Sequence, residues 1–176
     1  SGAAPGADDD ASGTSGVMAA AAIMASRHFE RTVRFVFFTG EEQGGCGSAA
    51  YAAAAAAKND DIVGVVNLDM IAYDAVGQPS FRLHTRVPGD PGAAADRELV
   101  DVFTGVVNDY GLDLAPVLTM DGEEASDHSS FWSQGYPAIL AIEDDYDDFN
   151  PYYHSAGDTT GVFNEAYFTS FVKAVV

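Results

Sequence analysis

Short apolar runs alternate with helix-like segments along most of the chain. Residues 32–39 (TVRFVFFT) are rich in β-branched and aromatic residues, which is typical of a strand that is covered on both faces, and residues 62–68 and 137–142 predict two further buried, apolar strands. Residues 81–85 predict a shorter strand, and residues 114–119 predict an edge strand. These five segments are the predicted strands of the fold.

Helical segments lie between and after these strands. Alanine-rich stretches and apolar residues at helical spacing predict helices over residues 12–28, 48–58, 96–110 and 164–176. Helices that alternate with buried strands indicate an α/β fold, a three-layer α/β/α sandwich with a mostly parallel, mixed central sheet. In such sheets, ligands bind at the carboxyl ends of the strands, where we expect Glu41, Asp69 and Glu143.

The length and composition predict a single domain over residues 1–176. No apolar run reaches the about 18 residues that a membrane span needs, so no span is predicted. Asp and Glu number 27 against 8 Lys and Arg, which gives a net charge of −19. Such a field repels nucleic acid and anionic lipid, so neither is an expected partner. A surface this acidic suits high salt or an extracellular setting, and we expect a secreted or extracytoplasmic protein.

Acidic residues follow predicted strands and precede a predicted helix. Glu41 and Glu42 come after the first strand, and Asp69 comes after the second. Neighbouring residues that leave a strand point in different directions, so one Glu can bind a metal while the other faces a substrate. Taken alone, the Glu pair fits a solvated turn, and Asp8-Asp9-Asp10 fits a helix-capping loop or a calcium site. Taken together, converging carboxylates repel one another and indicate a divalent metal between them.

His154 lies in a polar loop beyond a buried strand, where a metal ligand is expected. His28 and His84 are interpreted as surface or core residues. Ser126-Asp127-His128 contains the residue types of a hydrolytic triad, but three consecutive residues cannot form one through their side chains. We interpret this stretch as a pocket wall. Carboxylate oxygens combined with imidazole favour zinc, cobalt or manganese over calcium.

Five motifs in order carry a resemblance to a known family. They are PGADDDASG, RTVRFVFFTGEEQGGCGS, VNLDM, SDHSSFW with GYPA, and YHSAGDT. The chain resembles the co-catalytic di-zinc aminopeptidases of the secreted bacterial leucine aminopeptidase type. That group is related to glutamate carboxypeptidase and to glutaminyl cyclase.

The resemblance implies the metal ligands Asp9, Glu42, Asp69 and His154. It implies that Asp9 bridges two zinc ions, that Glu42 and His154 complete one site, and that Asp69 binds the other ion. It further implies Glu41 as the general base and acid, which takes a proton from the metal-activated water and passes it to the leaving amine. Tyr153 is implied as a catalytic hydrogen-bond donor to the developing oxyanion.

One family feature is missing from this sequence. Members carry a His-x-Asp motif upstream of the Asp loop, and its His binds the metal that Asp69 holds. Only eight residues precede Asp9 here, and none of them is His. The first strands of the family fold are missing as well, so the resemblance implies an N-terminally truncated zinc-peptidase domain. We expect two zinc ions in a complete site and one within reach of this chain, held by Asp9, Glu42 and His154 as in glutaminyl cyclases.

The predicted function is that of a zinc-dependent exopeptidase. It is an aminopeptidase that hydrolyses N-terminal residues from peptide substrates with a free N-terminus, by means of a metal-activated water. Two alternatives stay open. One is glutaminyl-cyclase-like or carboxypeptidase activity on the same fold, which the loops of the substrate pocket decide. The other is a non-catalytic, peptidase-like binding domain, which the missing His motivates.

Overall fold

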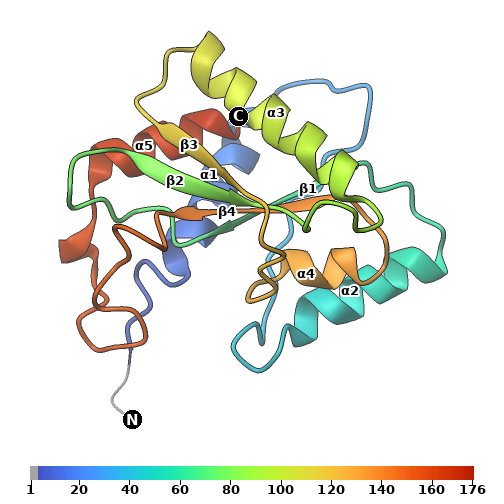
Figure 1. Cartoon of the computed structure of the whole chain (residues 1–176), viewed down its shortest axis with the longest axis horizontal. Coiled ribbons are helices and arrows are strands. Elements are labelled where there is room, and N and C mark those ends of the chain that lie inside the picture. Colours follow the sequence, from blue (N-terminus) through green and yellow to red (C-terminus); the bar gives the residue numbers. More distant parts are fainter. Residues whose placement is uncertain (1–3) are drawn as a thin grey trace.

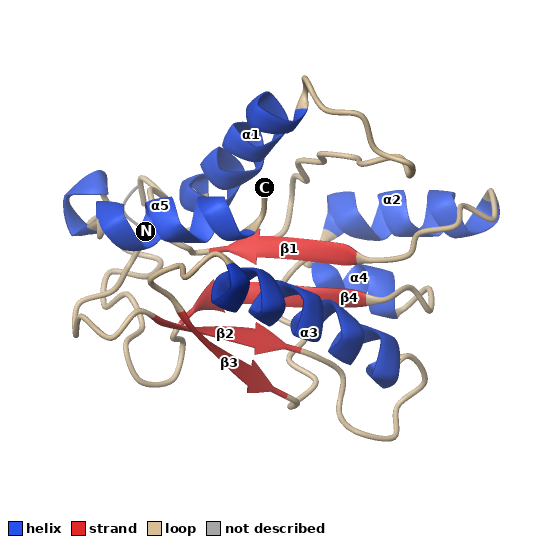
Figure 2. Cartoon of the chain, turned by 90° about the horizontal axis from the view of Figure 1, so that it is seen from above, coloured by secondary structure: helices blue, strands red, loops and turns tan. Residues whose placement is uncertain are grey.

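A single mixed sheet forms the centre of the computed structural model, which describes residues 4–176. Its strands are β1 (Val65–Asp69), β2 (Ser80–His84), β3 (Ala115–Thr119) and β4 (Ala138–Glu143), in the spatial order β1-β4-β2-β3. β1 runs parallel to β4 and β2 runs parallel to β3, while β2 and β4 are antiparallel (Figure 2). The prediction of a mostly parallel, mixed sheet is confirmed, and β3 lies at one edge as predicted.

Helices cover both faces of the sheet. The helices are α1 (Ala11–Met24), α2 (Cys46–Ala57), α3 (Ala93–Asp109), α4 (His128–Trp132) and α5 (Glu165–Ala174), with a 3-10 turn at Thr160–Val162. In Figure 1, α3 and α5 lie above the sheet, and α2 and α4 lie below it. The three-layer α/β arrangement is confirmed. No helix within residues 4–176 has the length and apolar character that crossing a bilayer requires.

Side-chain alternation along β4 explains how one strand serves two cores. All six of its residues are buried. Ile139 and Ala141 join the larger core with Phe81 and Phe171, on the face covered by α3 and α5. Ala138 faces the opposite way and packs with Phe131 of α4. Residues 138–142 of this strand are accordingly all apolar, because both faces of the strand are covered.

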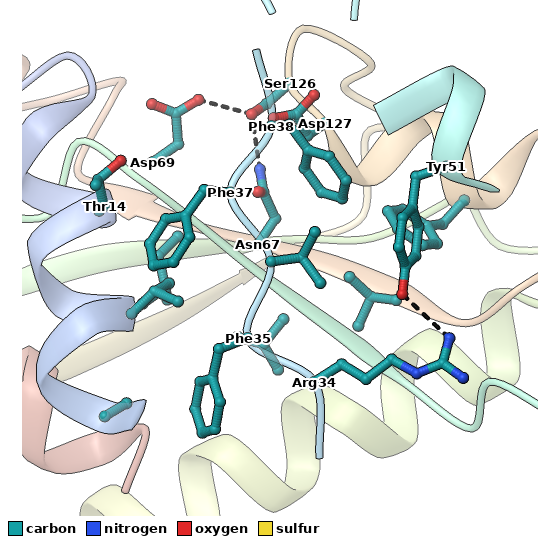
Figure 3. A pocket seen from close by; sticks show the side chains of 18 of the residues that line it. Thr14, Arg34, Phe35, Phe37, Phe38, Tyr51, Asn67, Asp69, Ser126 and Asp127 are labelled. Atoms are coloured by element: carbon teal, nitrogen blue, oxygen red, sulfur yellow. Dashed lines mark hydrogen bonds between the residues drawn. The ribbon is translucent and has the colours of Figure 1, made fainter. Parts of the chain in front are cut away.

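The prediction of a strand over residues 32–39 is wrong for the described chain. The segment is extended, but the backbone of residues 32–38 forms no hydrogen bond with any other described residue. β1, at the end of the sheet, is paired on one edge only. A cavity of about 1140 Å³, lined by residues 31–42 and 60–69, separates the two (Figure 3). A strand needs a neighbour for its ladder hydrogen bonds, and across this cavity there is none.

The start of α1 also differs from the expectation. The helix begins at Ala11 because Asp10 is its N-cap, and the Asp10 carboxylate accepts a hydrogen bond from the Gly13 amide at 3.1 Å. A Cβ at Gly13 would overlap the Leu68 carbonyl, so glycine allows the helix to start directly against β1. This packing carries the Asp8-Asp9-Asp10 loop to the end of β1, beside Asp69.

Candidate metal centre

Three predicted ligands meet at the carboxyl end of the sheet. Asp9 precedes α1, Glu42 follows the extended segment, and His154 lies in the turns after β4. His154 Nε2 lies 3.1 Å from Asp9 Oδ2 and 2.7 Å from Glu42 Oε1. One ligand atom from each residue lies within 4.8 Å of the others. Two carboxylates and one imidazole at this spacing fit a zinc ion, and the exposed Glu42 and His154 leave the position open on one side.

The backbone at His154 is held in an unusual conformation. Its φ of 54° lies in the left-handed region that residues other than glycine seldom adopt. Its ring stacks on that of Tyr153, with centroids 3.7 Å apart and planes 21° apart. Such strained backbone often occurs where a side chain must be aimed at a site. Here it turns the imidazole towards Asp9 and Glu42.

Asp69 lies in a second carboxylate group beside the first. Its Oδ2 accepts a hydrogen bond from the Ser126 hydroxyl at 2.6 Å, and the Asn67 amide donates to that hydroxyl at 2.7 Å (Figure 3). Burial raises the pKa of Asp69, and the Asp9 and Glu41 charges raise it further, while the Ser126 hydrogen bond opposes them. Burial and the Asp69 charge likewise raise the pKa of Asp10. The pair therefore lies where a positive charge would stabilise it.

The ligand Asp9 and the predicted base Glu41 show the same crowding. Burial and the Glu42 charge raise the pKa of Asp9 to about 6, although His154 lowers it. Burial, Glu42 and Asp127 raise the pKa of Glu41. A carboxylate with a raised pKa accepts a proton more readily near neutral pH. Glu41 thus has the electrostatic setting of a general base.

Tyr153 is a half-exposed phenol at the rim of this site. Burial, followed by the charges of Asp9 and Glu42, raises its pKa to about 12. The hydroxyl therefore keeps its proton over the neutral pH range and can donate a hydrogen bond. Burial and the neighbouring negative charges therefore keep Tyr153 a neutral hydrogen-bond donor.

The remaining sequence candidates have different surroundings. Ser126 and Asp127 line the cavity beside Asp69, as expected for a pocket wall. Glu143 lies outside the metal-ligand group, fully buried, and accepts hydrogen bonds from the backbone amides of Tyr73 and Asn150. His84 is buried between Asp121 and Asp145, which agrees with a core residue.

Three buried polar residues lie next to the site but are not among the ligands that the sequence predicts: Asp8, Asn150 and Asp158. Two of them lie inside quoted motifs, PGADDDASG and YHSAGDT. For Asp8 and Asp158, membership of a motif is the only signal in the sequence, because their hydrogen-bond partners lie far away along the chain.

The chain is similar to known proteins in sequence and in fold. Residues 1–176 match Peptidase family M28, and the chain belongs to that family. The resemblance found in the sequence is thereby confirmed.

Three known proteins illustrate the relationship. "Leucine aminopeptidase 1" of Ajellomyces dermatitidis is 32% identical over 163 residues, which cover 89% of this chain and 42% of that protein. The LapA aminopeptidase of Legionella pneumophila matches with a TM-score of 0.86 and 28% identity, over 100% of this chain and 45% of that one. The glutaminyl cyclase of Porphyromonas gingivalis, at 15% identity, shares the fold, with a TM-score of 0.69 over 98% of this chain and 62% of that one. The chain thus spans less than half the length of the two aminopeptidases.

Proposed function

We propose that this chain carries the catalytic site of a zinc-dependent aminopeptidase that releases N-terminal residues from peptides. The observation that carries the proposal is the convergence of Asp9, Glu42 and His154 within 4.8 Å of one another. Membership of a peptidase family supports a peptide as the substrate, and relatives named as aminopeptidases support attack at the N-terminus.

Asp9, Glu42 and His154 would hold one zinc ion, and Asp69 together with Asp9 would contribute to a second. Oxygen and imidazole donors of this kind suit zinc. Zinc, when bound, supplies a positive charge that polarises a carbonyl group and makes a water molecule more acidic. The same charge would stabilise the ionised forms of Asp9 and Asp69, whose pKa values are raised in its absence.

Glu41 is the proposed general base and acid. Its carboxylate accepts a proton from the attacking water and later passes that proton to the amine of the departing peptide. The raised pKa of Glu41 supports both steps, because the carboxyl group must gain and lose a proton near neutral pH. The neighbouring Glu42 contributes to that shift while serving as a ligand.

Tyr153 is the proposed donor to the oxygen that becomes negative during the reaction. Its ring lies against His154 and its hydroxyl stays protonated at neutral pH. A neutral donor fixed beside the developing charge lowers the barrier without reorganisation of solvent. Tyr153 would therefore act on the transition state more than on the bound substrate.

The acidic surroundings favour a substrate with a positive end. Asp9, Asp10, Glu41, Glu42 and Asp69 all line the same cavity, which offers an ammonium group an attractive environment. A free N-terminus carries that group, whereas a C-terminal carboxylate would be repelled. This charge distribution supports aminopeptidase over carboxypeptidase action. The net charge of −19 supports an extracytoplasmic location for the protein.

Replacement of the base tests the proposal. In the zinc-loaded chain, Glu41→Gln should lower the turnover of a leucine anilide by about 100-fold or more, with zinc content unchanged. Glu98→Gln, at an exposed position of α3, is the matched control and should keep full turnover. Turnover by Glu41→Gln equal to that of the control would exclude Glu41 as the base. No turnover by the unaltered, zinc-loaded chain would contradict the proposed activity of this chain.

A further inference from the structure

The carboxylate of Asp158 joins two loops of the metal centre without belonging to the ligand set. Asp158 is only 1% exposed and lies four residues after His154. Its Oδ1 accepts a hydrogen bond from the Asp8 amide at 3.0 Å, and its Oδ2 accepts one from the Asp9 amide at 3.1 Å. Both oxygens are thus used on consecutive amides of the loop that carries a ligand.

The Asn150 side chain links Asp8 to Asp158 through hydrogen bonds. Its side-chain amide donates to Asp8 Oδ2 at 3.1 Å and to Asp158 Oδ1 at 3.4 Å. The side-chain oxygen Oδ1 of Asn150 accepts a hydrogen bond from the Tyr152 backbone amide at 2.9 Å. Asp8 and Asn150 are fully buried. We call these three residues, Asp8, Asn150 and Asp158, the Asp158 clamp.

Two further hydrogen bonds attach the loop that carries Asp9 to neighbouring segments. Asp8 Oδ1 accepts a hydrogen bond from the Ala72 amide at 3.0 Å, just beyond β1. The Ala7 amide donates to the Asp158 carbonyl at 3.3 Å. The Asp9 loop is therefore fixed both to the segment that follows β1 and to the segment that carries His154. Buried hydrogen bonds to carboxylates are strong, so this attachment is rigid.

We propose that Asp158 is a positioning residue that sets the placement of Asp9 relative to His154, and so the affinity of the site for zinc. The inference rests on the proposed function, since it takes Asp9 and His154 as ligands. Asp158 would act through the Asp9 backbone, because both of its carboxylate oxygens accept hydrogen bonds from backbone amides. Groups that orient ligands in this way change metal affinity by about 10–100-fold when they are removed.

Substitution of the carboxylate by an amide tests the role. Asp158→Asn places an NH2 group against one of the two backbone amides and removes that hydrogen bond. Zinc affinity, measured by competition with a chromophoric chelator, should fall by about 10–100-fold. The visible absorption spectrum of the cobalt-substituted protein should also change, because ligand geometry determines it. Neither readout depends on peptide turnover.

Asp148→Asn is the matched control. Asp148 Oδ2 also accepts two consecutive backbone amides, from Ala75 at 2.8 Å and Val76 at 3.0 Å, but those residues carry no proposed ligand. This variant should keep the zinc affinity and the cobalt spectrum of the unaltered chain. Equal weakening in both variants would overturn the proposal, because it would indicate a general loss of stability.

Asn150→Ser provides a second variant in case Asp158→Asn fails to fold. It removes the donor to Asp8 and Asp158 but leaves both amide bonds to the Asp158 carboxylate, so a smaller loss of zinc affinity is expected. Unchanged affinity and spectrum in the folded clamp variants would overturn the positioning role while leaving the metal site intact. Failure of the unaltered chain to bind zinc would instead contradict the proposed metal centre itself.

Discussion

The imidazole of His154 lies 2.7 Å from the carboxylate of Glu42, although 112 residues separate them in the sequence. Glu42 follows the apolar segment of residues 32–39, and His154 lies in the turns after β4. Loops from distant parts of the chain thus deliver both groups to one point. Asp9 completes the group from a third loop, which requires that all three be held in register by the surrounding structure.

Raised carboxylate pKa values make the stability of the zinc-free chain depend on pH, and Asp9 contributes to this dependence together with Asp69 and Asp10. The Asp9 pKa of about 6 in the folded chain exceeds the about 3.9 of a free Asp, so the folded state binds more protons between those values. This contribution is complete below the lower value and is lost as the pH rises through the upper one. We expect the metal-free chain to be more stable at about pH 5 than at about pH 7.5, measured by urea unfolding.

Asp9→Asn removes the titrating group and should reduce that difference. Saturating zinc should also reduce it, because a bound cation stabilises the ionised carboxylate at the higher pH. A difference in stability between the two pH values that Asp9→Asn leaves unchanged would contradict the raised pKa of Asp9.

Tyr153→Phe should lower kcat by about 100-fold while KM changes little, because the hydroxyl would act on the developing charge. Steady-state kinetics of the zinc-loaded chain measure both constants. Tyr152→Phe is the control, since this neighbouring exposed tyrosine has no proposed part in the reaction. A rise in KM at constant kcat would instead assign Tyr153 to substrate binding.

A buried ion pair fixes the start of β4. Arg86 donates to both Asp96 oxygens, Nε to Oδ2 and Nη2 to Oδ1, each at 2.7 Å, and the Ala138 amide donates to Asp96 Oδ1 at 3.0 Å. Asp96→Ala leaves the Arg86 charge buried without its partner, and we expect a loss of about 3–5 kcal/mol in the free energy of unfolding. Chemical denaturation measures this loss.

The exposed pair Arg97–Asp101 on α3 serves for comparison. Asp101→Ala should cost no more than about 0.5 kcal/mol, because solvent screens the pair. Similar losses in the free energy of unfolding for the two variants would show that the buried pair stabilises the fold no more than the exposed one.

The unpaired edge of β1 should be detectable as exposed apolar surface. Val33, Phe37 and Val66, near the cavity between the extended segment and β1, are 44%, 52% and 43% exposed. Contiguous apolar surface of this kind binds hydrophobic dyes and promotes association. Phe37→Ser should reduce the fluorescence of bound anilinonaphthalene sulfonate, whereas Val76→Ser, at an exposed position in the loop between β1 and β2, should not. Equal effects would contradict this location for the dye.

Much of the fold could be predicted because local patterns dictate it. The continuous apolar run of β4 and the alanine-rich composition of α2 are visible in the sequence. The run at residues 32–39 is also mostly apolar, yet it is unpaired, because pairing depends on a neighbouring strand that composition does not encode. α4 was missed because five residues are too few to show a helical period.

Only part of the candidate site could be predicted from the sequence. Asp9, Glu42 and His154 could be proposed from motifs, since ligand residues recur in recognisable local sequences. The clamp could not, because Asp158 and Asp8 are 150 residues apart and their roles arise only from burial and backbone hydrogen bonds. Local motifs indicate the ligand residues, whereas the residues that position those ligands can be recognised only from the three-dimensional packing.

The most direct test of the proposed metal centre is anomalous diffraction at the zinc edge from crystals soaked in zinc. We expect a peak within about 2.0–2.2 Å of Asp9, Glu42 and His154 ligand atoms. A zinc peak bound elsewhere, with none between these three side chains, would contradict the account.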